Sequence, residues 1–347
     1  MTTKVFIDPT SKIQYSSFYI QGLYEIFGRK NVSFSGKYFR ELKRRTESHS
    51  YDHYMAFVVI KGRDNIHKII IDFRDKVSIK ESAYYWCDKY AKINFNKELT
   101  DGRFHKKIIS IPPGFGIKIW NFRETAYNCI CNLIKCRFLT PVSINKFIRD
   151  YYLQFKRSRL ENYFSGNYHE SSFSLSNKPY VFFISSLWSN KLITGTNLWR
   201  KTFIEYCKLS NVDFEGGLFA LESHPLYGEF KEHVFSNQYP VDVYINKTIK
   251  STFVFNTPAV FNCHGWKLGE FLAMGKAIIS TKLFNELPEP LIHGKNIHFV
   301  SDFEELNGAI KLILSDSSYK NLLETGAKTY YSKYGQPEKV LDYILKK

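Results

Sequence analysis

The feature that most constrains the fold is a series of short apolar runs with helical stretches between them. In the first half of the chain such runs occupy residues 4–8, 56–60, 68–73 and 107–111, and a helical stretch at 15–27 follows the first. Apolar runs of this length are typical of strands buried in parallel sheets. Their alternation with helical stretches predicts an α/β unit with a mainly parallel sheet.

The same alternation returns in the second half of the chain. Strand-like runs are expected at residues 180–185, 214–218, 253–255, 259–261, 276–280 and 296–300. The clearest helical stretches between them cover residues 197–209, 268–274 and 303–314. We therefore expect a second α/β unit of ordinary domain size, with a cleft between the two halves.

A change in composition sets the expected domain boundaries. Residues 121–162 are helical in pattern, basic and aromatic, and a segment rich in Ser, Asn and Gly follows them. Such a segment is typical of a linker. We expect an N-terminal domain over 1–165, a linker over 166–179 and a C-terminal domain over 180–330. Residues 331–347 are expected to form a helix, and packing back on the N-terminal domain is one option for it.

The charge of the chain favours an anionic partner. Its 49 Lys and Arg against 33 Asp and Glu give a formal net charge of +16. Nucleic acid, an acidic membrane surface and phosphorylated small molecules all suit such a balance, and a lysine-rich genome is an alternative cause. No apolar window reaches the roughly 18 residues of a membrane span. The first residues also lack the long apolar region of a signal peptide, so we expect a cytoplasmic protein.

The six cysteines form no disulfide framework and no Cys-x-x-Cys pair. Cys129, Cys131 and Cys136 are close enough in sequence to be metal ligands, but no fourth ligand stands near them in a suitable pattern. Buried free thiols on a helix are the preferred interpretation, in a reducing compartment.

The chemistry concentrates in residues 253–300, which read as strand, tight turn, helix and strand. The turn ends at His264 and Gly265, the helix opens near Trp266, and Gly275 closes it. In such a unit the turn and the helix N-terminus lie at the carboxyl edge of the sheet, where ligands of open α/β folds bind. Free backbone N–H groups and the helix dipole favour a phosphate there.

Three side-chain features strengthen this expectation. Gly265 lets a ligand approach the backbone, and Lys267 adds a positive charge. Glu270 lies three residues on, hence on the same helix face, where a carboxylate suits two ribose hydroxyls. The alternative is a solvated Lys267–Glu270 pair beside a turn histidine. Their occurrence together in this strand-turn-helix position favours a site.

This segment resembles the donor-binding half of GT-B glycosyltransferases and is similar to the bacterial group-one enzymes of surface polysaccharide synthesis. The resemblance rests on His264-Gly265-Trp266-Lys267-Leu268-Gly269-Glu270 and on the residues 272–276 that follow. Members of this class often carry a Glu, seven residues, and a second Glu that holds the nucleotide ribose. Glu270 matches the second acid, whereas Asn262 stands in place of the first. That acid often assists the donor sugar in retaining members, so the departure leaves the stereochemical course open.

The resemblance implies two facing Rossmann-like domains, with the acceptor held mainly by the first and the donor by the second. It implies transfer of a sugar from a nucleotide-sugar donor to a glycan or lipid-linked glycan acceptor, without a cofactor. This fold often places basic groups on the donor diphosphate after the first strand of the second half, where Asn197 and Arg200 stand. An exposed basic helix face is the alternative. The chain has no Asp-x-Asp pair, the metal-holding signature of the other large transferase fold, so no metal is expected.

The first half offers less specific candidates. Gly114 follows two prolines at the end of a predicted strand, in a loop expected to face the cleft. If the reaction inverts, a base would come from this half, and Asp8, Asp72 and His53 lie near strand ends; helix capping is the alternative for the acids. The expected catalytic residues are Lys267, Arg200 and Asp72. The expected substrate-binding residues are Asn197, His264, Gly265, Trp266, Glu270 and Gly114.

Two other functions stay open on the sequence. One is a catalytically idle GT-B relative that acts as an interaction subunit, which Asn262 favours. The other is a basic nucleic-acid-binding protein, although the chain lacks helix-turn-helix, zinc-finger and RNP signatures.

Residues 144–164 suggest where the protein works. They combine Lys146, Arg149, Lys156, Arg157 and Arg159 with Phe147, Tyr151, Tyr152, Phe155, Tyr163 and Phe164. One expectation is peripheral contact with an anionic membrane through this stretch, at the inner face of the cytoplasmic membrane, with the cations at the headgroups and no insertion. The alternative is a helix packed on the first domain.

Overall fold

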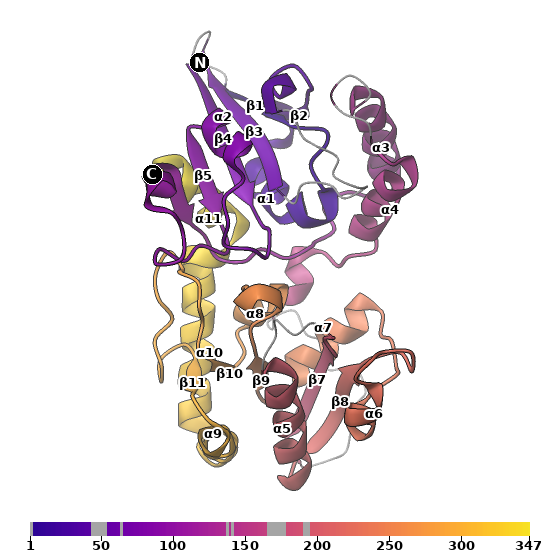
Figure 1. Cartoon of the computed structure of the whole chain (residues 1–347), viewed down its shortest axis with the longest axis vertical. Helices are drawn as coiled ribbons and strands as arrows, with labels where there is room; N and C mark the ends of the chain where they lie inside the picture. Colours follow the sequence, from indigo (N-terminus) through magenta and orange to yellow (C-terminus); the bar gives the residue numbers. More distant parts are fainter. Residues whose placement is uncertain are drawn as a thin grey trace. The chain divides into compact units, whose positions relative to one another are not determined.

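The computed structural model describes residues 3–42, 54–62, 65–136, 139, 142–164, 178–189 and 195–347. They form two compact units, shown in Figure 1. Unit 1 comprises residues 1–159, 285–289 and 334–347, and unit 2 comprises residues 160–284 and 290–333. Most of the expected linker at 166–179 lies outside the described residues.

Unit 1 is built on a six-stranded sheet with the order β2-β1-β3-β4-β5-β6. Its strands are β1 (Thr3–Ile7), β2 (Val32–Phe34), β3 (Tyr54–Lys61), β4 (Asn65–Asp72), β5 (Lys89–Lys92) and β6 (Ile108–Ser110). β1 pairs with β2 in parallel, as do β4 with β5 and β5 with β6, whereas β3 is antiparallel to both neighbours. Only residues 62–64 separate β3 from β4 in the sequence, too few for the crossover that a parallel pair needs.

Helices cover the sheet of unit 1. They are α1 (Ile13–Phe27), α2 (Glu81–Trp86), α3 (Phe122–Cys136), α4 (Ile144–Phe155) and α11 (Pro337–Lys346). α11 packs on α1, α4 packs on α1, and α3 packs on α4. A Cβ atom at Gly22 of α1 would lie 2.4 Å from the carbonyl oxygen of Pro337, so the glycine permits the close approach of α11.

Unit 2 contains parallel strands throughout. They are β7 (Tyr180–Ser186), β8 (Asp213–Phe219), β9 (Val254–Asn256), β10 (Ile278–Thr281) and β11 (His298–Val300). β7 pairs with β8, and β10 pairs with β9 and β11. β9 lies beside β7, and the N–H of Thr252, just before β9, donates to the carbonyl of Tyr180, the first residue of β7, at 2.7 Å. The hydrogen-bonded strands form a two-stranded sheet, β7-β8, and a three-stranded sheet, β11-β10-β9. Placed side by side through the contact of β7 with β9, they follow the order β8-β7-β9-β10-β11 of a doubly wound fold, so the expected α/β class is confirmed.

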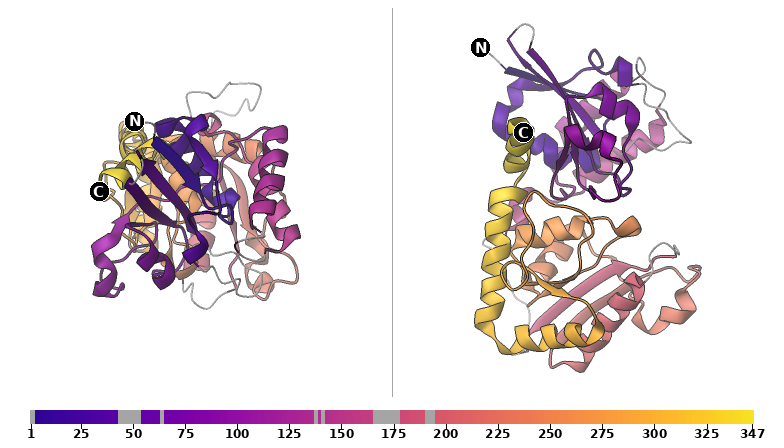
Figure 2. Two further views of the ribbon diagram at one scale, coloured as in Figure 1. Left: turned by 90° about the horizontal axis from the view of Figure 1, so that it is seen from above. Right: turned by 60° about the vertical axis from the view of Figure 1, so that its left-hand side comes forward.

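Helices cover both faces of this second sheet. They are α5 (Thr196–Leu209), α6 (Tyr227–Phe230), α7 (Val241–Lys250), α8 (Trp266–Met274), α9 (Phe303–Ser315) and α10 (Ser317–Tyr330). One face packs on α5 and α9 through a core that includes Phe183, Phe203, Phe255, Ile279 and Ile310. In the right-hand view of Figure 2, α9 and α10 meet in a corner beside the strands. No helix in the described part of the chain has the length and apolar character needed to cross a membrane.

Candidate functional site

The candidate site lies in unit 2, where the chain order of the strands reverses. β7 is the first strand of the unit, and its neighbours are β8, the second, and β9, the third. The helices after β7 and β9, α5 and α8, therefore start at the carboxyl edge next to this reversal. Open α/β sheets bind their ligands at such a point. The functional expectation for residues 253–300 thus falls at the position that the topology favours.

Arg200 reaches this edge from the second turn of α5. Its side chain is buried, with Nε donating to Thr257 Oγ1 at 2.9 Å and Nη1 donating to the Ser186 carbonyl at 2.8 Å. Burial lowers the pKa of Arg200 to about 10. Among the described residues, no carboxylate forms an ion pair with it. A buried cation held by neutral acceptors is well placed to receive an anionic ligand.

Lys267 reaches the same edge from the first turn of α8. Its Nζ donates to the carbonyl of Ile184 in β7, and it lies 5.4 Å from the centre of the Phe183 ring. Burial, and then the charge of Arg200, lower the pKa of Lys267 to about 7, and Glu270 acts in the opposite direction. The two cations are therefore close enough to repel each other, and a negative ligand would relieve that repulsion.

Glu270 stands one turn further along α8. Its side chain is 5% exposed, and it accepts a hydrogen bond from the hydroxyl of Tyr244 at 3.0 Å. Tyr244 comes from α7, which packs on the same sheet. The sequence pattern did not single out Tyr244, because its partner lies 26 residues away. Glu270 is thus a buried acceptor beside the two cations rather than half of a solvated pair.

The turn between β9 and α8 differs from the sequence expectation. The predicted strand at 259–261 is wrong, because Val260–Asn262 form a short 3-10 turn instead. Phe261 and Asn262 have φ angles of 57° and 56°, in the left-handed region that non-glycine residues rarely occupy. The Ala259 N–H donates to the Cys263 carbonyl at 3.1 Å and closes the turn. This turn carries the chain to Gly265, the N-cap of α8.

A small pocket lies against this turn. Its lining includes Asn256, Thr257, Asn262, His264, Gly265 and Phe284. Two of the predicted substrate-binding residues, His264 and Gly265, thus share a pocket with Thr257, the partner of Arg200. Asn262, which replaces the first acid of the family pattern, also lines it. Phe284 was not foreseen, because it follows β10 and joins the pocket only through the fold.

The remaining expected residues of unit 2 lie nearby with different roles. Trp266 is half-buried at the first position of α8. Asn197 uses its amide on the backbone of Trp188: its Nδ2 donates to the Trp188 carbonyl at 2.8 Å, and its Oδ1 accepts from the Trp188 N–H at 3.2 Å. Asn197 therefore fixes the backbone after β7, and its predicted contact with substrate stays a prediction.

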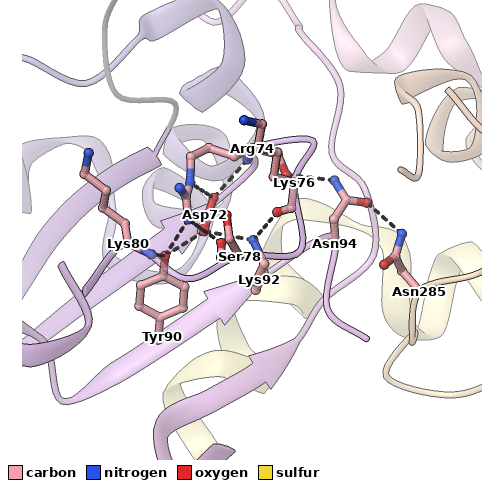
Figure 3. A network of polar contacts seen from close by, with 9 residues as sticks. All are labelled: Asp72, Arg74, Lys76, Ser78, Lys80, Tyr90, Lys92, Asn94 and Asn285. Carbon is pink, nitrogen blue, oxygen red and sulfur yellow. Dashed lines mark hydrogen bonds and ion pairs between the residues drawn. The ribbon is translucent and has the colours of Figure 1, made fainter. Parts of the chain in front are cut away.

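Asp72 lies in unit 1, inside the polar network of Figure 3. Its carboxylate is fully buried and accepts hydrogen bonds from Tyr90 at 2.6 Å, Lys92 at 2.9 Å and two nitrogens of the Arg74 guanidinium at 2.7 and 3.0 Å. Burial opposes ionisation, but Lys92 and Arg74 outweigh it and hold the pKa of Asp72 well below its usual range. This environment disfavours a role as catalytic base, because such a carboxylate takes up a proton poorly, and the predicted role of Asp72 stays a prediction.

The other candidates of unit 1 have structural partners. Gly114 is buried, its N–H donates to the Tyr19 hydroxyl at 3.3 Å, and a Cβ atom there would meet the Phe18 ring at 2.8 Å. Asp8 accepts from the Thr10 backbone and hydroxyl at 2.9 and 2.7 Å. His53 lies outside the described residues.

The potential metal ligands of the chain are its His, Cys, Asp and Glu side chains. Within the described ranges, no group of three or more His, Cys, Asp and Glu side chains is arranged to hold a metal ion. All six cysteines are free thiols, with Cys136 buried and Cys129 and Cys131 partly buried on α3.

No family model matches the chain, and no curated protein matches it. Among solved structures it is similar to several glycosyltransferases. The C-terminal domain of LpcC, a group 1 family glycosyl transferase from Francisella tularensis, is 16% identical and aligns over 45% of this chain and 85% of that one, with a TM-score of 0.33. A glycosyltransferase from Rickettsia africae is 14% identical over 80% of this chain and 68% of that one, with a TM-score of 0.40.

A third solved structure, Anabaena HepE in complex with UDP-glucose, is 12% identical over 77% of this chain and 65% of that one, with a TM-score of 0.41. At these TM-scores the likeness is broad, and no site residue is assigned from it.

Proposed function

We propose that this chain is a glycosyltransferase that moves a sugar from a nucleotide-sugar donor bound in unit 2. The observation that carries the proposal is a pair of cations at the carboxyl end of β7, the buried Arg200 and the partly buried Lys267. Both sit where two helices start, so their charges add to those of free helix N–H groups. A diphosphate fits this environment, and Glu270 supplies an acceptor for the ribose hydroxyls. The resemblance of residues 264–270 to group-one glycosyltransferases supports sugar transfer as the reaction.

The same residues suggest how the reaction is accelerated. When the sugar leaves its donor, negative charge grows on the departing diphosphate. Fixed cations in a buried site stabilise that charge more strongly in the transition state than in the bound donor. Arg200 is held in place by Thr257 and Ser186, so it needs no rearrangement to act. We propose that this pair makes a metal ion unnecessary.

The acceptor is proposed to be a glycan or lipid-linked glycan in bacterial surface polysaccharide synthesis, on the strength of the sequence resemblance. The proposed place of work is the cytoplasm, with peripheral contact at the inner face of the membrane. No catalytic base is assigned, because the environment of Asp72 disfavours that role.

The test is a panel of UDP-, GDP-, ADP- and CMP-sugars incubated with the full chain. We expect at least one donor to release its nucleotide, slowly by hydrolysis and faster with a suitable acceptor, and we expect EDTA to leave the rate unchanged. A strict requirement for added Mg²⁺ or Mn²⁺ would contradict the metal-free account. Donor binding without any turnover would favour a catalytically idle relative, and tight binding of oligonucleotides alone would favour a nucleic-acid-binding protein.

A further inference from the structure

The helices α3 and α4 carry a large share of the exposed apolar side chains. Eighteen large apolar side chains are exposed in the described residues, and seven of them belong to these two helices. They are Phe122, Tyr127, Ile130, Ile134, Ile144, Ile148 and Tyr152. In α3, Tyr127, Ile130 and Ile134 recur at spacings of three and four residues and so share one helix face. That face is 54–69% exposed.

The packing of the two helices leaves this face outward. α4 buries Phe147, Tyr151 and Gln154, and α3 buries Asn132, whose Nδ2 donates to the Tyr151 hydroxyl at 2.8 Å. Figures 1 and 2 show the pair at one margin of unit 1, on the opposite side from α11. The aromatic residues Phe147 and Tyr151, for which the sequence left both a core and a lipid surface open, are therefore core residues. Four of the seven exposed apolar residues lie on α3, which the sequence did not single out.

The exposed charges around these residues are positive. Lys146 and Arg149 of α4, Lys156 at its C-cap and Arg123 of α3 are exposed. The acidic residues of the two helices are both engaged. Glu124 pairs with Arg29 at 3.0 Å, and the buried Asp150 accepts the Ile13 N–H at the start of α1 at 2.5 Å.

We infer that the α3–α4 face docks on an anionic lipid surface. Apolar side chains of α3 enter the boundary between headgroups and acyl chains, and the cations of α4 meet the headgroups, as in helices that lie in a membrane interface. A second copy of the chain fits this face less well, because the cations on its own α3–α4 face would lie against the same cations here and repel them. The inference deepens the peripheral contact of the proposed function, and it changes the nature of that contact, which now includes insertion as well as charge.

Co-sedimentation with vesicles tests the inference. The full chain is mixed with vesicles of phosphatidylcholine alone, or with added phosphatidylglycerol, at low and high salt. We expect at least tenfold tighter binding to the anionic vesicles at low salt. Part of that binding should survive high salt, because salt screens charges and leaves apolar insertion intact. Absence of binding to anionic vesicles at low salt would overturn the inference.

Variants separate the two contributions. Ile130→Ser with Ile134→Ser should weaken binding to anionic vesicles at least tenfold, and Lys146→Gln with Arg149→Gln should reduce the preference for anionic lipid about tenfold. Leu209→Ser, at a leucine of α5 that is 84% exposed, is the matched control and should bind as the wild type does.

Two outcomes with the α3 variant would overturn the inference. In the first, the variant binds vesicles as tightly as the wild type does. In the second, the wild type is a dimer in solution and the variant is a monomer. Nucleotide-sugar binding is measured on the same samples, so a failure of vesicle binding alone leaves the proposed function standing.

Discussion

Arg200 and Lys267 donate to carbonyl groups of the same strand, at Ser186 and Ile184 of β7. They arrive from different helices, α5 and α8, and lie 67 positions apart in the sequence. The strand therefore fixes the spacing of two cations that the chain brings together only by folding. Their charges are concentrated at one end of β7, which is the basis of the predictions on the donor site.

Removal of either cation should lower turnover more than it raises the donor KM. The charge on the departing diphosphate is greater in the transition state, so we expect Lys267→Met and Arg200→Gln each to lower kcat about 10²-fold. Lys201→Ala is the control, because Lys201 is a half-exposed neighbour on α5 that lies 3.8 Å from Glu205. Steady-state kinetics with the best donor of the panel measure this. A wild-type kcat in both cation variants would show that the diphosphate does not bind at this position.

Donor affinity should fall as pH rises above 7. The pKa of Lys267 is about 7 without ligand, and a bound diphosphate would raise it. The ammonium form, which binds better, is therefore nearly complete about one pH unit below 7, is half populated near pH 7 and is lost at higher pH unless the ligand restores the proton. Donor binding is linked to the uptake of one proton by Lys267, so affinity falls by at most about tenfold for each pH unit above 7. The fall ends at the raised pKa that Lys267 has in the complex.

Calorimetry with a nucleotide-sugar suits this measurement, because its diphosphate has no proton that titrates near neutral pH. Lys267→Arg should flatten the profile, since arginine stays charged. An equally steep profile in that variant would assign the titration to another group.

Glu270 should discriminate in favour of ribose. Hydrogen bonds to a charged acceptor contribute about 1.5–3 kcal/mol each, or roughly 10- to 100-fold in affinity. We expect the wild type to bind a nucleoside diphosphate at least tenfold more tightly than its 2′,3′-dideoxy analogue, and Glu270→Ala to bind both equally. Tyr244→Phe removes only the hydroxyl that donates to Glu270 and should keep most of the preference. A preference that persists in Glu270→Ala would place the ribose elsewhere.

Asp72→Asn should destabilise the protein rather than disable a base. The variant leaves Lys92 and the Arg74 guanidinium without their shared buried carboxylate, and such losses cost about 3–5 kcal/mol. Urea denaturation of wild type and variant measures the difference. The lowered pKa also means that this contribution to stability is present at neutral pH and is lost only as pH falls through the folded value. A variant with wild-type stability, normal donor binding and no turnover would restore Asp72 as the base.

Local signals explain the parts of the fold that the sequence predicted. Gly275 ends α8 in the left-handed conformation, with φ of 61°, and the apolar run after it forms β10. A glycine at a helix end and an apolar run are both visible without knowledge of the fold. The α/β class of unit 2 followed from the same alternation.

Long-range contacts explain the parts that it did not. β5 was missed because Lys92 reads as polar, although it is fully buried beside Asp72, 20 residues away. The strand expected at 259–261 failed because an apolar run does not reveal the positive φ of Phe261. The partners of Arg200, Thr257 and Ser186, lie 57 and 14 residues from it. The burial of Arg200 and the partial burial of Lys267 distinguish a site from a basic surface, and both depend on the folded unit.

The most direct test of the central claim is calorimetric titration of the nucleotide-sugar panel into three proteins: the wild type, the Arg200→Gln, Lys267→Met double variant, and Lys201→Ala. The account predicts that at least one nucleotide-sugar binds the wild type and Lys201→Ala with equal affinity, and that the folded double variant binds it at least tenfold more weakly. Equal affinity in the double variant, or no binding of any nucleotide-sugar to the wild type, would contradict the account.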